Sequence, residues 1–169
     1  NLQNSSLRGV NLENAAFDDS NAQKSNFTLV RAAKSSFVNA SLAGSNFHSA
    51  IVSGANFTGA DLTGVDFSGA DLEGANFSGA ILKNTDFSGA NLAKALFPGA
   101  KFEQTNLTEA SLQEASLREA NLSSVTFKLT NLERADLRGC NMTGVNLRQI
   151  KAKGAKIGEV IGADEKELI

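Results

Sequence analysis

Residues 55–74 read ANFTG ADLTG VDFSG ADLEG, four successive pentapeptides with a large apolar residue at the centre of each. The same five-residue step runs without an insertion from Leu2 to Ile157, and all 11 Phe residues of the chain occupy it. In an α-helix, a five-residue step would scatter these side chains around the axis instead of collecting them on one face. The pattern therefore indicates a short-period repeat architecture built from extended segments.

Each pentapeptide predicts three extended residues followed by a two-residue turn. Side chains two apart on an extended chain point to the same side, so Ala55 and Phe57 face inward and Asn56 faces water. Phe recurs every ten positions over residues 17–97, which requires an even number of sides, and four sides with 20 residues per coil fit. The predicted core ladder is Phe17, Phe27, Phe37, Phe47, Phe57, Phe67, Phe77, Phe87, Phe97 and Phe127.

The last residue of the pentapeptide predicts the geometry of the corners. It is Gly at most positions between 54 and 99, and Gly tolerates the positive φ that the third residue of a type II turn requires. Between 104 and 134 the same position holds Gln, Glu, Ser, Leu or Arg. We therefore predict type II corners over residues 54–99 and a different turn type over residues 104–134.

Composition excludes several classes of protein. The 169 residues carry 16 Lys and Arg against 18 Asp and Glu, and 41% of them are hydrophobic, as expected for a folded domain without a strongly basic nucleic-acid surface. One Cys and one His cannot form an internal disulfide or a four-ligand zinc site. No apolar run is long enough to span a membrane. We expect no cofactor, no metal, no membrane span and no direct nucleic-acid binding.

The chain resembles the pentapeptide-repeat proteins, whose pattern of Ala, Asp or Asn, Leu or Phe and two variable residues appears in residues 55–64. The resemblance covers residues 1–157. It implies an all-β fold, a right-handed quadrilateral parallel β-helix of about eight coils with four pentapeptides each. Residues 158–169 leave the register, and we predict a short C-terminal cap or tail there, with Asp164 as the N-cap of a helix. The compartment stays open between bacterial cytoplasm, periplasm, thylakoid lumen and a domain of a larger protein.

The reactive side chains of the sequence do not form a recognisable catalytic pattern. His48 falls at an exposed turn position, and Cys140 replaces Ala at an inward position, where a buried and inert thiol is expected. Glu114 and Arg134, like Glu133 and Lys153, are 20 residues apart and predict cross-strand ion pairs. The outward Asn and Asp residues predict a stacked, hydrogen-bonded ladder.

We therefore predict a non-enzymatic scaffold that binds an unidentified protein partner. An end-to-end or C-terminal homodimer is a further expected contact, because terminal coils offer unpaired backbone groups. The alternative is a DNA-mimicking inhibitor or protector of a type II topoisomerase (gyrase), which requires a continuous negative face. The candidate interaction surface comprises Asp66, Asp86, Arg118, Arg138, Ile51, Ile81 and Leu96.

Overall fold

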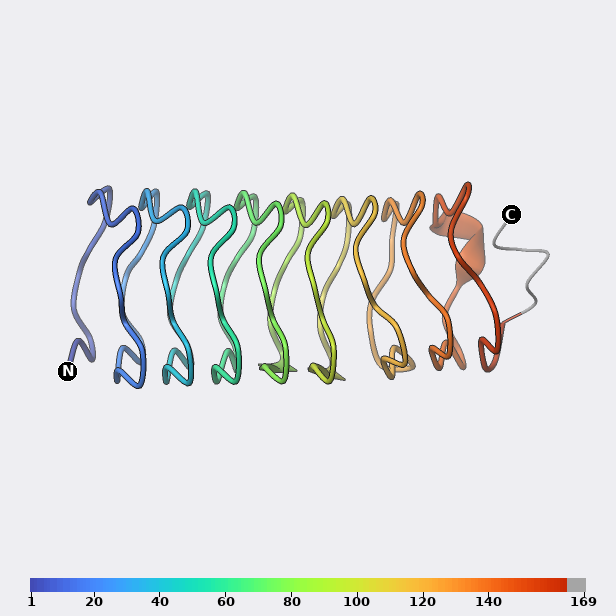
Figure 1. Ribbon diagram of the computed structural model, residues 1–169, viewed down its shortest axis with the longest axis horizontal. Coiled ribbons are helices and arrows are strands. Elements are labelled where there is room, and N and C mark those ends of the chain that lie inside the picture. The colour runs from blue at the N-terminus through green and yellow to red at the C-terminus, as the bar shows by residue number, and fades with distance from the viewer. Residues whose placement is uncertain (164–169) are drawn as a thin grey trace.

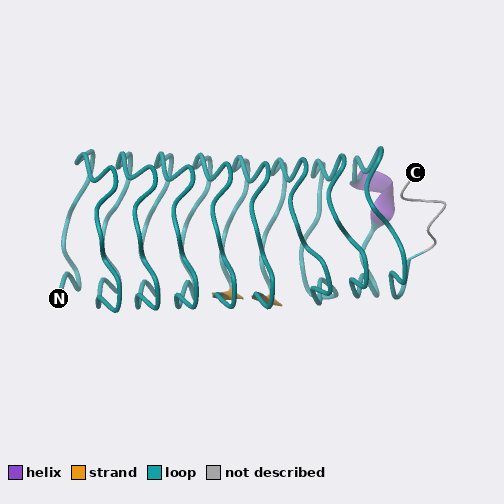
Figure 2. Ribbon diagram, in the orientation of Figure 1, coloured by secondary structure: helices purple, strands orange, loops and turns teal. Residues whose placement is uncertain are grey.

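The computed structural model describes residues 1–163 as a right-handed, four-sided parallel β-helix, whose coils stack along one long axis in the order of the sequence (Figure 1). Its named elements are few: β1 (Ile81–Lys83), β2 (Lys101–Glu103) and the 3₁₀ helix η1 (Leu147–Gln149). Turns follow every short extended segment, so most sides contribute a single parallel bridge and appear as loop in Figure 2.

A backbone ladder with a 20-residue register joins successive coils. Bridges pair residues 20 apart, such as Asp71 with Asn91, always in parallel. The Leu72 N–H donates to the Asn91 carbonyl at 2.7 Å, and the Asn91 N–H donates to the Ala70 carbonyl at 2.9 Å. At the corner, the Ala75 N–H closes a turn on the Leu72 carbonyl at 3.0 Å. Both the sides and the corners thus find backbone partners, as burial of the coil requires.

We name the four sides after one coil: faces A, B, C and D have Phe67, Leu72, Phe77 and Leu82 as central residues, and each face continues every 20 residues. Faces A and C lie opposite each other and carry the aromatic columns. Rings stacked along a column have centroids 4.4–5.3 Å apart, and rings from opposite columns meet edge to face at 5.5–6.3 Å. Burial of each large side chain stabilises the fold by roughly 1.5–3 kcal/mol.

Several polar residues at the small inward position donate to a carbonyl of the coil before them. The hydroxyls of Ser45, Thr85 and Thr130 donate to carbonyls 23 residues earlier at 2.7, 2.9 and 2.7 Å. Cys140 makes the same contact through its thiol, 2.9 Å from the Leu117 carbonyl. The regular stacking places a carbonyl beside these positions, which therefore accept Ser, Thr or Cys. Ser35 instead donates to the Ala32 carbonyl of its own corner at 2.6 Å, and the Ser20 hydroxyl has no partner among the described residues.

The prediction of a different turn type over residues 104–134 was wrong at every corner except Ser124, which has no positive φ. Gln104, Glu109, Glu114, Glu119, Leu129 and Arg134 all have φ between 52° and 62°, in the left-handed region that Gly occupies at the other corners. Positive φ costs a non-Gly residue roughly 1–2 kcal/mol. At Glu109, Glu114, Glu119 and Arg134 the ladder offsets this cost, because the N–H of the strained residue donates to a carbonyl of the next coil, as Glu114 does to Glu133 at 3.0 Å. The Gln104 N–H donates to the Ser124 hydroxyl at 3.3 Å, and the Leu129 N–H has no described partner.

The regular bridge pattern changes near the C-terminal end of the described residues. Near the C-terminal end, η1 replaces the expected bridge on face A, while Asn141 still pairs with Ile161 on face D. The division at residue 157 stays a prediction. The predicted helix N-capped by Asp164 lies outside the described residues.

Substitution of Gly by Ala at two corners distinguishes the cost of positive φ from the cost of a steric clash. At Gly64, an added Cβ meets nothing within 4 Å, whereas at Gly59 it meets the Asn39 Oδ1 at 2.5 Å, and both residues have positive φ. We expect Gly64→Ala to lower the free energy of unfolding by about 1 kcal/mol and Gly59→Ala to lower it further. Urea denaturation followed by circular dichroism measures both. Equal losses in the two variants would contradict this assignment.

Candidate protein-interaction surface

Three of the seven predicted surface residues come together on face C. Leu96 is 43% exposed and bridges Ser116, which in turn bridges Asp136, so Leu96 lies in one outward column with these polar residues. Arg118 and Arg138 occupy the adjacent turn column of the same face, 20 residues apart. The remaining four are dispersed over face A (Asp66, Asp86), face B (Ile51) and face D (Ile81).

The two aspartates of face A accept backbone hydrogen bonds from their own corners. Asp66 and Asp86 bridge each other, and their Oδ1 atoms accept the N–H groups of Ser68 and Ser88 at 2.8 and 2.9 Å. Asp61 and Asp71, their neighbours in sequence, belong to faces D and B. The acidic residues between 61 and 86 therefore form no continuous negative strip.

The predicted Asn/Asp ladder is only partly formed. Cross-coil contacts occur where Asn91 Nδ2 donates to Asp71 Oδ1 at 3.0 Å and where Asn106 donates to Asp86 at 2.9 Å. The outward Asn and Asp side chains, Asp71 and Asp86 among them, also accept the N–H two residues ahead, as Asp61 does from Thr63 at 3.0 Å. This local bond closes the corner. At Asp71 and Asp86, the same Oδ1 accepts both the local N–H and the amide of the adjacent coil.

Each arginine of face C has its own acidic partner. Arg138 forms a two-bond fork with Asp136, with Nε to Oδ1 at 2.8 Å and Nη2 to Oδ2 at 2.6 Å. These hydrogen bonds, partly opposed by desolvation, lower the pKa of Asp136 from 3.8 to about 2. Arg118 Nε donates to Glu119 Oε1 at 3.2 Å. The two guanidinium groups are thus paired separately and do not converge on one anion.

The other predicted ion pairs have different outcomes. Arg134 Nη1 lies 3.5 Å from Glu114 Oε1, as predicted. Among residues 1–163, no ion pair joins Glu133 to Lys153, and Glu133 instead accepts a hydrogen bond from Gln113 Nε2 at 3.1 Å. All these groups are exposed, so each contact contributes little to stability.

The isolated reactive groups occupy the predicted environments. His48 is exposed, and its Nδ1 lies 2.8 Å from the Ser68 hydroxyl. Cys140 is buried, and desolvation raises the pKa of its thiol to about 11. Within the described part of the chain, no three His, Cys, Asp or Glu side chains cluster as a metal site, and no helix is long and apolar enough to cross a membrane.

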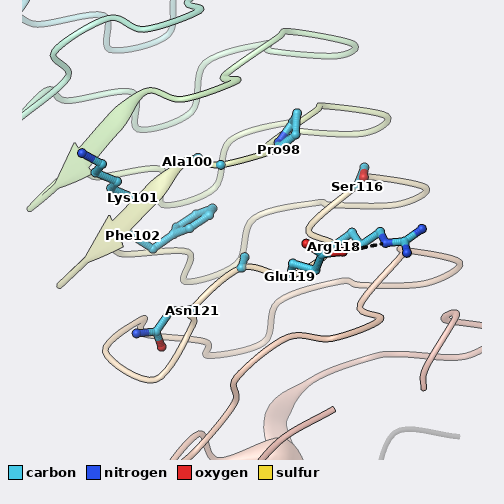
Figure 3. A pocket seen from close by; sticks show the side chains of 10 residues that line it. Pro98, Ala100, Lys101, Phe102, Ser116, Arg118, Glu119 and Asn121 are labelled. Carbon is cyan, nitrogen blue, oxygen red and sulfur yellow. Dashed lines mark hydrogen bonds and ion pairs between the residues drawn. The ribbon is translucent and has the colours of Figure 1, made fainter. Parts of the chain in front are cut away.

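A crevice opens at the corner between faces C and D, next to Leu96. Its volume is about 630 Å³, and it separates the segment Pro98–Phe102 from the segment that begins at Ser116 and ends at Asn121 (Figure 3). In Figure 1, the coil after β2 stands visibly farther from it at this corner than the earlier coils stand from one another. The five-residue repeat does not predict this opening.

The crevice exists because the ladder is interrupted. Where the register is regular, the Gly79 N–H donates to Pro98, the Lys101 N–H to Ala80 and the Leu62 N–H to Ile81, each at 2.9 Å. The bonds expected one coil after the first two, Gly99 to Arg118 and Asn121 to Ala100, are absent from the described hydrogen bonds, as is the bond expected two coils after the third, Phe102 to Asn121. Lys101 likewise pairs with Ile81 in the preceding coil but has no bridge to Asn121.

We attribute the interruption to an extra aromatic residue in one core layer. Phe102 occupies a column of face D in which the neighbouring residues are Leu82 and Leu122, and its ring lies 5.4 Å from that of Phe97 at a tilt of 48°. An oversized side chain in a packed core is accommodated by backbone displacement. The signal in the sequence is a Phe only five residues after Phe97, where the earlier Phe residues are ten apart.

The Asp136–Arg138 pair predicts a specific pH dependence. The pKa of Asp136 is depressed, so the stability it contributes is present above pH 3.8 and is lost as the pH falls through about 2. We expect Arg138→Ala to return the midpoint of Asp136, followed by NMR of its carboxyl carbon, towards 3.8. The matched variant Arg118→Ala should leave the midpoint unchanged, and an unshifted midpoint in Arg138→Ala would refute the pairing.

Phe102→Leu tests the origin of the crevice. Leu is the residue found in the adjacent layers of this column, so the variant should fold and let the two coils pair. We expect hydrogen exchange of the Asn121 and Phe102 amides to slow by at least about tenfold, because each amide would gain a ladder bond. Unchanged exchange in this variant would show that the aromatic ring does not hold the coils apart.

Solved structures similar to this one include a pentapeptide-repeat protein, HetL from the cyanobacterium Nostoc sp. strain PCC 7120, involved in regulation of heterocyst differentiation. It is 25% identical over 97% of this chain and 87% of its own, with a TM-score of 0.74. The plasmid-mediated fluoroquinolone resistance protein QnrB1 is 18% identical over 90% of this chain and 86% of its own, with a TM-score of 0.43. No curated protein sequence matches the chain.

A family model described as pentapeptide repeats matches the chain in eight copies, over residues 1–31, 25–64, 40–79, 60–97, 85–123 and 115–151. These matches span most of the chain, and they follow the register in which the structure stacks its coils. The resemblance drawn from residues 55–64 is therefore confirmed, and the chain belongs to the pentapeptide-repeat family.

Proposed function

We propose that this protein is a non-enzymatic scaffold that binds a protein partner through the face C patch, defined as Leu96, Pro98, Ser116, Arg118, Asp136 and Arg138. The proposal is supported by the separation of inward from outward side chains. The inward positions are closed by stacked Phe, Leu and Ala, whereas the outward positions change from coil to coil while the ladder register is kept. A surface of this kind can be adapted to a partner at small cost to the core.

Leu96 is the observation that carries the proposal. It is an exposed large apolar side chain in a column otherwise occupied nearby by Asn76, Ser116 and Asp136. Arg118 adjoins it on the same face, and arginine is enriched at protein interfaces because its planar fork and apolar stem both contribute contacts. An apolar centre beside paired charges is the usual composition of a protein-binding surface.

DNA mimicry of a topoisomerase substrate finds less support in the surface. A mimic of regularly spaced phosphates needs negative charge in successive coils of one face. Asp66 and Asp86 provide two such coils, but Asn46 and Asn106 continue their column on either side. The regulatory role stated for HetL is compatible with a scaffold, and we extend to this chain only the general function of binding another protein.

Affinity capture with a matched pair of variants tests the proposal. Leu96→Glu and Ile51→Glu both replace an exposed outward apolar residue, with exposed fractions of 43% and 40%, on faces C and B. We expect wild type and Ile51→Glu to enrich the same protein from an extract of the source organism, and Leu96→Glu to lose at least about tenfold of it. Mass spectrometry quantifies the capture. Equal capture by both variants, or no specific capture by wild type, would exclude the face C patch.

A further inference from the structure

We propose that the crevice between β2 and Asn121 binds an extended peptide segment of the partner as an inserted strand, with an Asp of that segment between Lys101 and Asn121. This inference rests on the proposed scaffold function and names the mode by which part of the partner is held. The crevice lies beside the face C patch and shares Pro98, Ser116 and Arg118 with it.

The backbone of the two walls presents the groups that an extended chain needs. On the β2 side, the Phe102 N–H and the Ala100 carbonyl have no described hydrogen-bond partner, and on the opposite side the Asn121 N–H and carbonyl have none. In the regular coils, these same positions form the ladder. An inserted strand would accept from Phe102 and Asn121 and donate to Ala100 and Asn121. Strand addition to an exposed sheet edge gains its affinity from such main-chain bonds.

The side chains of the walls select the residue at the outward position. Lys101 is exposed, and among residues 1–163 its ammonium group forms no ion pair. Asn121 lies below it in the same column of face D. Elsewhere in this helix, the Asn91 amide donates to the Asp71 carboxylate of the adjacent coil at 3.0 Å. An Asp inserted between Lys101 and Asn121 would find both a cation and an amide donor.

The inward positions select small and apolar neighbours for that Asp. Ala100 and Ala120 flank the crevice at the small inward position, and Phe102 flanks it at the large one. Phe102 and Ala120 retain 7% and 6% exposure although they belong to the core. The fitting motif is therefore a small residue, Asp and a large apolar residue in succession. Glu119 also lines the crevice, but Arg118 pairs with it, so the charged lining residues carry a net charge of +1.

Titration with a synthetic peptide tests the inference directly. The probe is acetyl-Ala-Asp-Leu-Thr-Gly-amide, which has the sequence of residues 60–64 and thus the side-chain order of a strand on face D. In ¹⁵N-labelled protein, we expect saturable chemical-shift changes centred on the amides of Gly99, Phe102 and Asn121. Replacing the probe's Asp by Lys, or methylating the nitrogen of its Asp, should weaken binding at least about tenfold, because each removes one class of contact.

Variants of the protein supply the controls. Phe102→Leu should abolish the shifts by closing the crevice, and Lys101→Glu should weaken binding several-fold, whereas Lys34→Glu on face B should leave it unchanged. Absence of saturable shifts with wild type, or equal binding to wild type and Phe102→Leu, would overturn the inference. If Leu96→Glu loses the partner while the probe does not bind wild type, the scaffold proposal stands and the inserted strand is refuted. If the probe binds wild type and Leu96→Glu captures the partner as well as wild type does, the crevice is supported and only the face C patch is refuted.

Discussion

The backbone ladder between residues 20 apart is the constraint on which the rest of the structure depends. It fixes which side chains share the interior, because a pentapeptide cannot shift register without moving its central residue off the column. It also supplies the carbonyls that accept the buried hydroxyls of Ser45 and Thr85. Packing and polar satisfaction thus follow from one repeated geometry.

The corners between residues 104 and 134 show how the ladder overrides local preference. Residues such as Glu109 and Arg134 dislike positive φ as isolated residues, yet they adopt it here. The N–H of Arg134 donates to the Lys153 carbonyl at 3.1 Å, so a different corner would leave backbone groups unpaired in two coils. An unmade buried backbone hydrogen bond costs as much as the strain or more. At Ser124, beside the interrupted face, φ is not in the left-handed region.

The sequence was sufficient to predict the four-sided helix, the opposed Phe columns and the dispersal of Asp61, Asp66 and Asp71 over three faces, because each follows from counting in fives and twenties. It failed where two interactions compete. The turn type depends on ladder bonds against residue preference. The crevice depends on how a core layer accommodates the Phe102 ring next to Phe97. The repeat register gives the column of each side chain but not the backbone displacement that an extra ring causes.

A scaffold of this kind gains specificity from its irregularities, since a uniform ladder presents the same backbone edge and similar polar columns throughout. The central claim is that the ladder of the described residues is continuous except beside β2, at η1, and at the Ser124 and Gly144 corners. Scalar couplings across hydrogen bonds, measured by NMR in deuterated protein, test it directly. The account predicts a coupling from the Leu72 N–H to the Asn91 carbonyl and none from the Phe102 N–H to the Asn121 carbonyl. A coupling across the second pair, or none across the first, would contradict it.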